Sequence, residues 1–404
     1  MSTAAAVEPR PTPEFRATIY YFIQYMSGAA TTVYSGIWFA GQGLSTEQIG
    51  IINAVPTLIM LVLNILVGRI ADRASDWKQV IVIGSVIAGI TPLGLFFVHD
   101  FWGILTVWIL LSLPSGLVGP VADAATLRMT RRRGSHFGTI RAWGTVGYMV
   151  MLVLVGMVIG WFGGGIFLPL FLFFSLARTA AAFGLPRFRA SQDEKRESVH
   201  RPEAGAASRL GDAMRPFFIL PLVGFSMVYG THIVLNAFQG LLWKEQGLSE
   251  DIIGPLLAVA AITEAALMFA FARFGHKVSA RTLILASALT SVFRWTCMAL
   301  QPGIEWLIPL QGLNAITFAL GYMGCMTFIA NWTSDEIAAQ AQGFFQMLQQ
   351  VMSVICLTAF GWLMGFMGAQ AYFVAAAFAA LGAGLIWASI ALHGRKRPGE
   401  ARLG

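Results

Sequence analysis

The stretch Gln-Gly-Leu-Ser-Thr-Glu-Gln-Ile-Gly, residues 42–50, decides the fold, because residues 246–254 repeat it as Gln-Gly-Leu-Ser-Glu-Asp-Ile-Ile-Gly. Six of the nine positions are identical at an offset of 204 residues, about half of the 404-residue chain. The register continues beyond the repeat, since Arg69 and Arg273 each follow the last Gly by nineteen residues. Chance convergence of two similar turns is the alternative, but the shared register favours a duplicated chain.

Both copies have the chemistry of a tight turn between two helices. Gly43 and Gly247 suit the left-handed residue that follows a helix end. Ser45 and Ser249 suit the N-cap of the next helix, and the apolar residues around them have the spacing of a hydrophobic staple. The repeat therefore predicts two helical halves with matching topology.

Composition places the chain in a membrane. Hydrophobic residues make up 56% of it and charged residues 12%, about half the charged share of soluble domains. Apolar runs of about 20 residues, each long enough to span a bilayer, occupy roughly residues 17–40, 47–68, 78–98, 101–127, 137–161, 163–184, 216–243, 250–273, 279–300, 303–332, 338–364 and 368–393. The first fifteen residues hold no short apolar core or cleavage site, so no removable signal peptide is expected. We predict an all-α integral membrane protein with twelve transmembrane helices in two six-helix parallel repeats.

The net charge of +7 is compatible with a nucleic-acid partner, but the placement of the basic residues argues against one. Of the 27 Lys and Arg residues, 23 fall in one alternate set of loops and in the two tails, whereas only Lys244 falls in the opposite set. This positive-inside pattern predicts a multi-pass protein of a bacterial cytoplasmic membrane with both termini in the cytoplasm. The three cysteines lie within spans and lack metal-ligand spacing, so neither a disulfide nor a metal site is expected.

The hydrophobic pattern divides the chain into five segments, because a charged stretch separates two apolar regions. We predict a cytoplasmic tail (1–16), a six-helix bundle (17–186), a cytoplasmic linker (187–215), a second six-helix bundle (216–393) and a second cytoplasmic tail (394–404).

Polar residues at helical spacing share one face of a helix. Such a face is not expected to contact lipid alone. In the seventh span, Tyr229, His232 and Asn236 share one face, and Tyr25 of the first span is equivalent to Tyr229 at the offset of 204. The eleventh span has a glutamine face that contains Gln346. Packing between membrane helices is the alternative explanation, but for His232, Asn236 and the glutamines we favour a water-accessible cavity.

Charged residues inside a membrane span are costly and usually face a pathway or a partner. Glu264 lies nine residues before the end of the eighth span, about 13.5 Å of helix, which is near the midplane. Arg294 lies deep in the ninth span, and Asp123 and Arg141 are placed to form a pair. Arg178 of the sixth span can instead extend to the cytoplasmic surface.

The segment Gly-Arg-Ile-Ala-Asp-Arg, residues 68–73, resembles the Gly-x-x-x-Asp-Arg loop motif of the major facilitator superfamily. Ser75 stands where the motif has a later Gly. The resemblance implies two six-helix repeats with substrate bound at the midplane between them. It also implies that Gly68, Asp72 and Arg73 gate the cytoplasmic side.

A narrower resemblance is spread in short pieces over nearly the whole chain. Residues 137–147, which contain Arg141, resemble the fifth-span signature of the lactose permease and phenylpropionate permease-like branch, and Asp123 completes an acid–arginine pair similar to one that contacts sugar in lactose permease. Further resemblances cover residues 291–295 (that branch's ninth-span arginine) and residues 229–238 and 261–264 (the phenylpropionate and nucleoside–proton symporter groups).

One position departs from this pattern, because the relatives usually carry His where this chain has Asn314. A proton carrier beside Arg294 is therefore missing, and any proton coupling falls to Glu264, Asp123 or His232. The residues expected to contact substrate are Arg141, Asp123, Arg294, Tyr25, Trp143, Tyr229, His232, Asn236, Asn314 and Gln346.

These features predict a secondary transporter that moves a small organic solute by alternating access, and the resemblance implies proton symport. An aromatic-rich lining with intramembrane arginines suits a compact carboxylate such as an aromatic acid, with a sugar or a nucleoside as alternatives. A proton-driven effluxer of amphipathic compounds stays open. A non-transporting sensor or a membrane enzyme is disfavoured, because no catalytic constellation and no signalling domain are present in the sequence. We expect no enzyme activity, no cofactor, no nucleic-acid partner, and a monomer in the lipid bilayer.

Overall fold

The computed structural model describes residues 11–73, 77–135, 137–188, 215–274, 277–333 and 335–394, and these are nearly all helical. The first half holds α1 (Pro13–Gly41), α2 (Thr46–Arg73), α3 (Trp77–Ile90), η1 (Thr91–Phe96), α4 (Phe101–Arg133), α5 (Phe137–Phe162), η2 (Gly164–Ile166) and α6 (Phe167–Gly184). The second half holds α8 (Pro216–Glu245), α9 (Glu250–Phe274), α10 (Ala280–Ala299), α11 (Ile304–Gly312), η5 (Ala315–Leu320), α12 (Gly321–Trp332), α13 (Asp335–Met367), η6 (Gly368–Gln370) and α14 (Ala371–Gly394).

The described helices form twelve rods, because α3 continues into η1, η2 into α6, and α11 through η5 into α12. By length and composition, nine segments of the described chain are apolar enough to cross a membrane, and one of them, Ala341–Leu392, contains both α13 and α14. The helix α1 is not among the nine, and α2 contributes only a shorter apolar helix, Thr46–Leu61. The predicted all-helical membrane fold is confirmed.

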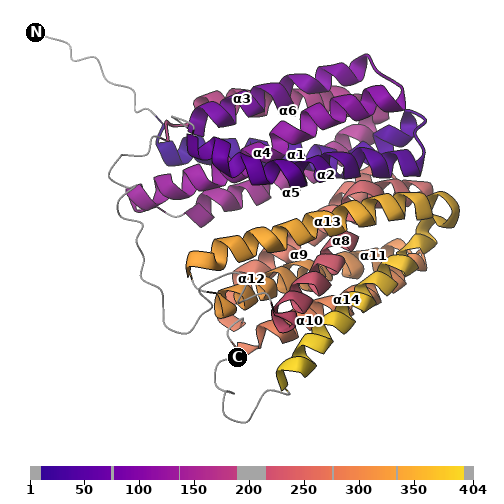
Figure 1. Ribbon diagram of the computed structural model, residues 1–404. Coiled ribbons are helices and arrows are strands. Elements are labelled where there is room, and N and C mark those ends of the chain that lie inside the picture. The colour runs from indigo at the N-terminus through magenta and orange to yellow at the C-terminus, as the bar shows by residue number, and fades with distance from the viewer. Residues whose placement is uncertain are drawn as a thin grey trace, which may run out of the picture.

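The two halves repeat the same packing. In the first half α1 packs on α5 and α6, and α3 packs on α4 and α6. In the second half α8 packs on α13 and α14, and α10 packs on α12 and α14, which are the equivalent pairs (Figure 1). The halves meet through α1 with α8, α2 with α13, and α5 with α9. At the offset of 204 residues, α2 is equivalent to α9 and α5 is equivalent to α13. The contact of α2 with α13 is therefore equivalent to the contact of α9 with α5, and the halves are related by a pseudo-two-fold axis.

The repeated turns have the predicted geometry. Gly43 and Gly247 have φ angles of 82° and 88°, which only Gly adopts freely. The residue after each Gly donates its N–H back to the last helical turn, in a Schellman-type closure. Ser45 and Gln48 form a reciprocal capping box, with bonds of 3.2 and 3.0 Å. Ser249 accepts backbone bonds from the first turn of α9 at its carbonyl oxygen.

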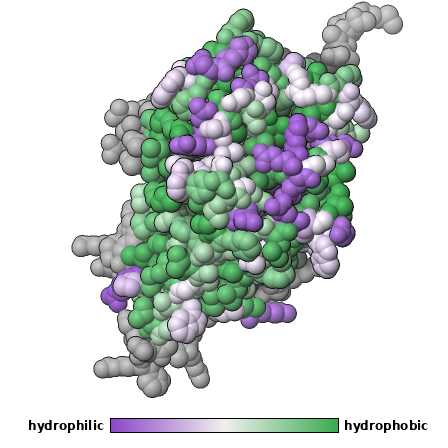
Figure 2. Space-filling view, turned by 90° about the vertical axis from the view of Figure 1, so that its right-hand side faces the viewer, coloured by the Kyte–Doolittle hydropathy of each residue, from purple (hydrophilic) through white to green (hydrophobic). Residues whose placement is uncertain are grey.

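The end of the molecule that carries these turns, hereafter the turn end, is where the halves close on each other. A Cβ atom added to Gly36 would lie 2.3 Å from the carbonyl oxygen of Ala237, and one added to Gly254 would lie 2.3 Å from that of Leu152. The Tyr34 hydroxyl also donates to a backbone oxygen of α9, at 3.1 Å. The two halves meet at the right of Figure 1 and diverge towards the left. In Figure 2, which looks onto the turn end, hydrophilic residues gather across a face flanked by apolar surface.

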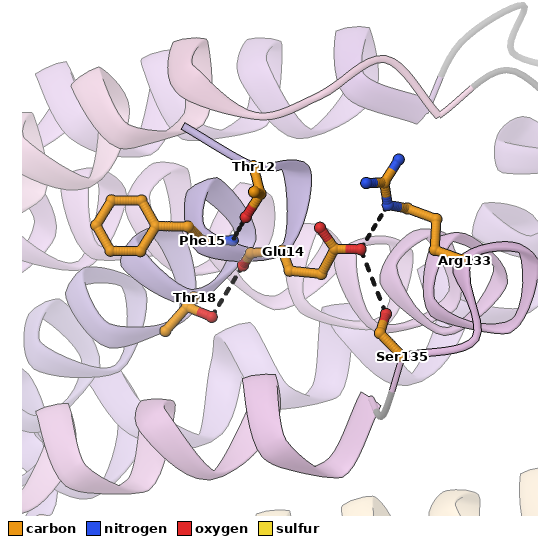
Figure 3. A network of polar contacts seen from close by, with 6 residues as sticks. All are labelled: Thr12, Glu14, Phe15, Thr18, Arg133 and Ser135. Carbon is orange, nitrogen blue, oxygen red and sulfur yellow. Dashed lines mark hydrogen bonds and ion pairs between the residues drawn. The ribbon is translucent and has the colours of Figure 1, made fainter. Parts of the chain in front are cut away.

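The opposite end of the first half is fastened by charged residues. Glu14 of α1 accepts hydrogen bonds from Arg133 and Ser135 at the end of α4 (Figure 3). Burial alone would raise the pKa of Glu14, but a backbone hydrogen bond and Arg133 outweigh it and hold that pKa below its usual value. Arg16 and Lys78 donate to the last carbonyl groups of α6, as cations at a helix C-terminus do. The helices α1, α3, α4 and α6 are thus tied into one body without help from the second half.

Candidate functional site

A charged cluster of the first half lies between α1, α4 and α5. Asp123 of α4 accepts a hydrogen bond from the Tyr21 hydroxyl at 2.7 Å and forms an ion pair with Arg141 of α5, Oδ1 to Nε, at 3.7 Å. The Arg141 guanidinium also lies over the Tyr25 ring, 4.3 Å from its centroid. The Asp123 and Arg141 side chains remain 42% and 35% exposed. The sequence-based pairing of Asp123 with Arg141 is therefore present in the structure.

Glycines in α5 make this arrangement possible. A Cβ atom on Gly144 would lie 2.7 Å from the Tyr25 ring, and one on Gly147 would lie 2.2 Å from the carbonyl oxygen of Phe22. The helix α5 therefore packs directly against α1, since small residues let membrane helices approach closely. This contact sets the height of Arg141 above the Tyr25 ring.

A chain of hydrogen bonds crosses the interior of the second half. Asn314 donates from Nδ2 to Glu264 Oε2 at 3.1 Å, and its Oδ1 accepts from Arg294 Nη1 at 2.9 Å. Arg294 is fully buried, and its other Nη donates to Gln311 at 3.1 Å. Glu264 and Arg294 are thus linked through the Asn314 amide and form no direct ion pair. The position where relatives usually carry His is here a neutral bridge.

The same chain continues to His232. Arg294 donates to the Thr317 hydroxyl at 3.0 Å, and that hydroxyl lies 2.9 Å from His232 Nε2. His232 Nδ1 lies 2.9 Å from the Val228 carbonyl oxygen, which can only accept. Nδ1 therefore carries a proton and donates to Val228. Nε2 forms a hydrogen bond with the Thr317 hydroxyl, which can donate to a neutral imidazole or accept from a protonated one.

A π-helical segment places Asn314 and Thr317. The segment η5, Ala315–Leu320, interrupts the tenth rod, and π-helical turns occur frequently at functional sites. Ser287 of α10 donates to the Thr317 carbonyl oxygen at 2.7 Å, which satisfies a backbone acceptor that the irregular turn exposes. Nothing in the sequence pattern of the tenth span predicts this interruption.

The two clusters face each other across the contact between the halves. The charge of Arg141 in α5 acts on Tyr322 of α12, and that of Glu264 in α9 acts on Tyr148 of α5. Tyr229 of α8 also lies near Glu264. Residues of the second half therefore approach α5 between Arg141 and Tyr148.

The structure does not bring every predicted residue to this region. Trp143 lies about 200° around α5 from Arg141, at two residues' separation, on an exposed face shared with Val150 and Met157. We therefore withdraw it as a substrate contact. Gln346 is exposed, but no contact in the described chain joins it to either cluster. The side chains of Asn236, Asp72 and Arg73 lie outside the described residues, as do the surroundings of Gly68.

Tyr21, Gln311 and Thr317 belong to the clusters but were not predicted as site residues. Gln311 is spaced three residues before Asn314, so the two share a helix face. That spacing is a signal that sequence reasoning could have used. Tyr21 gave the same signal, because it lies four residues before Tyr25 and shares its helix face.

Chemically, the region offers two arginines, two carboxyl groups and several tyrosine hydroxyl groups. It can bind an anion at a guanidinium group and hold a proton on a carboxyl group. In the described residues there is no group of His, Cys, Asp or Glu that could hold a metal ion.

The comparisons with known proteins agree with this geometry. The MFS_1 like family matches residues 15–380. The chain belongs to this family. It is 25% identical over 364 residues to the probable 3-phenylpropionic acid transporter of Escherichia coli (strain K12), which covers 88% of this chain and 92% of that protein. It is 28% identical over 320 residues to the maltose permease of Geobacillus stearothermophilus, which covers 75% and 77%.

Solved structures confirm the fold of this family member. The nucleoside transporter NupG superposes with a TM-score of 0.76 at 17% identity, covering 96% of this chain and 100% of that one. A bacterial homologue of the human lysosomal transporter Spinster, in an inward-facing and unoccupied conformation, gives 0.74 at 15% identity, covering 96% and 98%. The predicted membership of the major facilitator superfamily is confirmed. The prediction that the protein is a transporter and not an enzyme is confirmed as well.

Proposed function

We propose that this transporter of the MFS_1 like family carries a compact aromatic carboxylate together with a proton. The observation that carries the proposal is that, within the described residues, the two terminal nitrogens of Arg141 are free to bind a ligand. In the described chain its only hydrogen-bonding or ionic partner is Asp123, at Nε, which leaves the two terminal nitrogens to bind a substrate carboxylate. A guanidinium fork matches a carboxylate with two parallel bonds.

Aromatic side chains surround this fork. Tyr25 lies beneath the guanidinium, Tyr21 stacks on Tyr25 at 6.4 Å between ring centroids, and Tyr322 approaches from the second half. Such rings favour an aromatic or other compact apolar body on the substrate. The name of the Escherichia coli relative supports an aromatic acid. The maltose permease supports a sugar instead, and the test below separates the two.

Glu264 supplies the proton site. In the ionised state its negative charge faces Arg294 through Asn314, and in the protonated state that compensation is lost. A bound carboxylate then restores the charge balance of the region, so the proton and the anion favour each other's binding. Binding of one ligand alone leaves a net charge away from water, which is costly.

Alternating access follows from the asymmetry between the two ends. The halves are closed at the turn end, and the positive-inside pattern places that end outside the cell. The structure then corresponds to an inward-facing state, with both termini in the cytoplasm of a bacterial cell. Residues 187–215 act as the cytoplasmic linker between bundles 17–186 and 216–393, and Gly68, Asp72 and Arg73 act in gating the cytoplasmic end. The transporter works as a monomer.

A counterflow experiment tests the substrate class. Purified protein in liposomes loaded with 3-phenylpropionate should take up labelled 3-phenylpropionate, and external aromatic carboxylates should compete. The neutral amide of the same acid should compete at least about tenfold less well, because it cannot form the charged fork with Arg141. Competition by maltose but not by carboxylates would overturn the aromatic-acid proposal in favour of a sugar.

The Asp123–Arg141 pair gives a second prediction. Asp123→Asn and Arg141→Gln should each lower transport by about tenfold or more, because each leaves a partly buried charge uncompensated. The double variant should lower transport by less than the product of the two single reductions, since neither side chain is then left with an uncompensated charge. Initial uptake rates in liposomes measure this. Normal transport by both single variants, with normal thermal stability, would remove the pair from the mechanism.

A further inference from the structure

A second buried arginine lies in the first half, outside the proposed transport site. Arg178 of α6 is only 4% exposed, so it does not extend to the surface as the sequence allowed. Its Nη1 donates to the Ser115 hydroxyl at 3.3 Å, while its Nε and Nη2 have no hydrogen-bond partner. No described carboxylate forms an ion pair with it. A guanidinium group cannot lose its proton in a protein, so this positive charge needs compensation.

Further hydrogen-bond donors surround the same point. The Ser85 hydroxyl of α3 is 1% exposed and also lacks a partner. Tyr20 of α1 is fully buried; its hydroxyl lies close to the Ser85 hydroxyl without an ordinary hydrogen bond to it, and the charge of Arg178 acts on it. The only hydrogen bond that the Tyr20 hydroxyl makes in the described chain is a long one, 3.4 Å, to Gln24. Ser115 donates its own proton to the Leu111 carbonyl oxygen at 2.8 Å, so it can only accept from Arg178.

Arg294 shows what a compensated buried arginine looks like in this protein. Three neutral oxygens, on Asn314, Gln311 and Thr317, accept from its two Nη atoms, and Asn314 leads on to the carboxylate of Glu264. Arg178 has a single hydroxyl acceptor and no path to a carboxylate. The charge of Asp123 also acts on Tyr20, but the Asp123 carboxylate already forms a hydrogen bond with Tyr21 and an ion pair with Arg141.

We propose that a small inorganic anion of halide type, such as chloride, binds inside the first half between Arg178, Ser85 and Tyr20. Water could satisfy the donors but not the charge, so an anion is required. The surroundings are densely packed, since Thr179 donates to the Ser85 carbonyl oxygen at 2.6 Å and a Cβ atom on Gly89 would lie 2.1 Å from the Thr179 hydroxyl. A site beside such a close contact of α3 with α6 suits a single-atom anion better than an organic carboxylate.

The anion would also support the transport site. Tyr20 and Tyr21 are neighbours in α1 whose rings meet edge to face, 6.1 Å apart. The charge of Arg178 acts on Tyr20, and the Tyr21 hydroxyl donates to Asp123. Fixing Tyr20 therefore fixes the turn of α1 that presents Tyr21 to the Asp123–Arg141 pair. The anion holds this turn in place and does not itself touch substrate.

Thermal unfolding of the purified full-length protein tests the proposal. At constant ionic strength and cation, chloride or bromide should raise the Tm by a few degrees over gluconate, since a ligand bound only to the native state stabilises it. Ser85→Ala and Tyr20→Phe should raise the halide concentration needed for half of this shift by about tenfold, because each removes one hydrogen bond to an anion. Arg178→Gln should abolish the shift.

Ser175→Ala is the matched control, because Ser175 is a fully buried serine of the same helix that contacts Ser27 instead. Its halide dependence should equal that of the wild type. If Arg178→Gln does not fold, the Ser85 and Tyr20 variants decide. A crystal grown in bromide should show an anomalous peak at hydrogen-bond distance from Arg178 and Ser85. A wild-type Tm that is the same in all anions, or variants that keep the full halide shift, would overturn the proposal.

Discussion

Gly254→Trp is expected to reduce transport at least about 100-fold and to open the turn end. A Cβ atom at this position already lies 2.3 Å from the Leu152 carbonyl oxygen, so α5 and α9 cannot approach with a side chain between them. A shift of about 100-fold between two conformations needs only about 2.7 kcal/mol, which a backbone clash exceeds. Transport in liposomes should fall, because a carrier that cannot close one end cannot complete its cycle.

Accessibility distinguishes opening from misfolding. In a background in which Cys297, Cys325 and Cys356 are replaced, a Ser35→Cys substitution reports on the turn end, because Ser35 is 2% exposed. Gly254→Trp should make this thiol react with a membrane-impermeant reagent from outside the cell. The control is Gly384→Trp, at an exposed position where a Cβ atom meets nothing within 4 Å. Wild-type transport by a well-folded Gly254→Trp variant would show that the turn end need not close.

The same contact recurs in the other half, which makes the prediction testable twice. A Cβ atom on Gly50 of α2 would lie 2.7 Å from the Leu357 carbonyl oxygen of α13. Gly50 and Gly254 are the last residues of the repeated stretch. The duplication thus preserves a turn and also the close approach of each following helix to the opposite half.

The parts of the fold that sequence could predict are those governed by local rules. The positive φ angles at Gly43 and Gly247 follow from the helix-ending chemistry of the repeated stretch. The helix boundaries follow from apolar runs of bilayer length. The Asp123–Arg141 pair could be predicted because opposite charges inside a membrane seek each other.

The rest depends on how helices rotate and pack. Asn314 stands immediately before η5, where the tenth rod departs from a regular α-helix, so α-helical spacing alone does not predict its bridge between Glu264 and Arg294. Trp143 was misplaced because an aromatic residue suits a lipid-facing surface as well as a cavity. The same limit applied to Arg178, whose burial depends on three neighbouring helices.

Glu264 can serve as a proton carrier or as half of a permanent ion pair with Arg294, and the hydrogen bonds distinguish these two roles. A permanent ion pair with Arg294 that only fixed helix packing would require direct contact. The structure has an amide between the two groups instead, with bonds of 3.1 and 2.9 Å. Asn314 can therefore keep its bond to Arg294 whether or not Glu264 carries a proton. This independence allows Glu264 to gain and lose a proton without disrupting the buried arginine.

Glu264→Gln is expected to separate exchange from accumulation. The amide mimics the protonated carboxyl group, so counterflow of labelled substrate should stay within about twofold of the wild type. Uphill accumulation should disappear, because no proton is carried. One anion moves with one proton, so the transported pair carries no net charge and the pH gradient alone drives accumulation. A gradient of about two pH units corresponds to about 2.7 kcal/mol, so the loss is an accumulation ratio of about 100-fold. Uptake with and without an imposed pH gradient measures both quantities in the same liposomes.

Two variants sharpen the result. Glu305→Gln changes an exposed carboxyl group in the first turn of α11 and should leave accumulation unchanged. Asn314→Ala removes the bridge and should slow exchange and accumulation together, because Arg294 loses an acceptor and Glu264 loses its donor. Full accumulation by Glu264→Gln would mean that the proton travels elsewhere. Asp123 would then be the next carboxyl group to test, and His232, which forms hydrogen bonds at both ring nitrogens, the next imidazole.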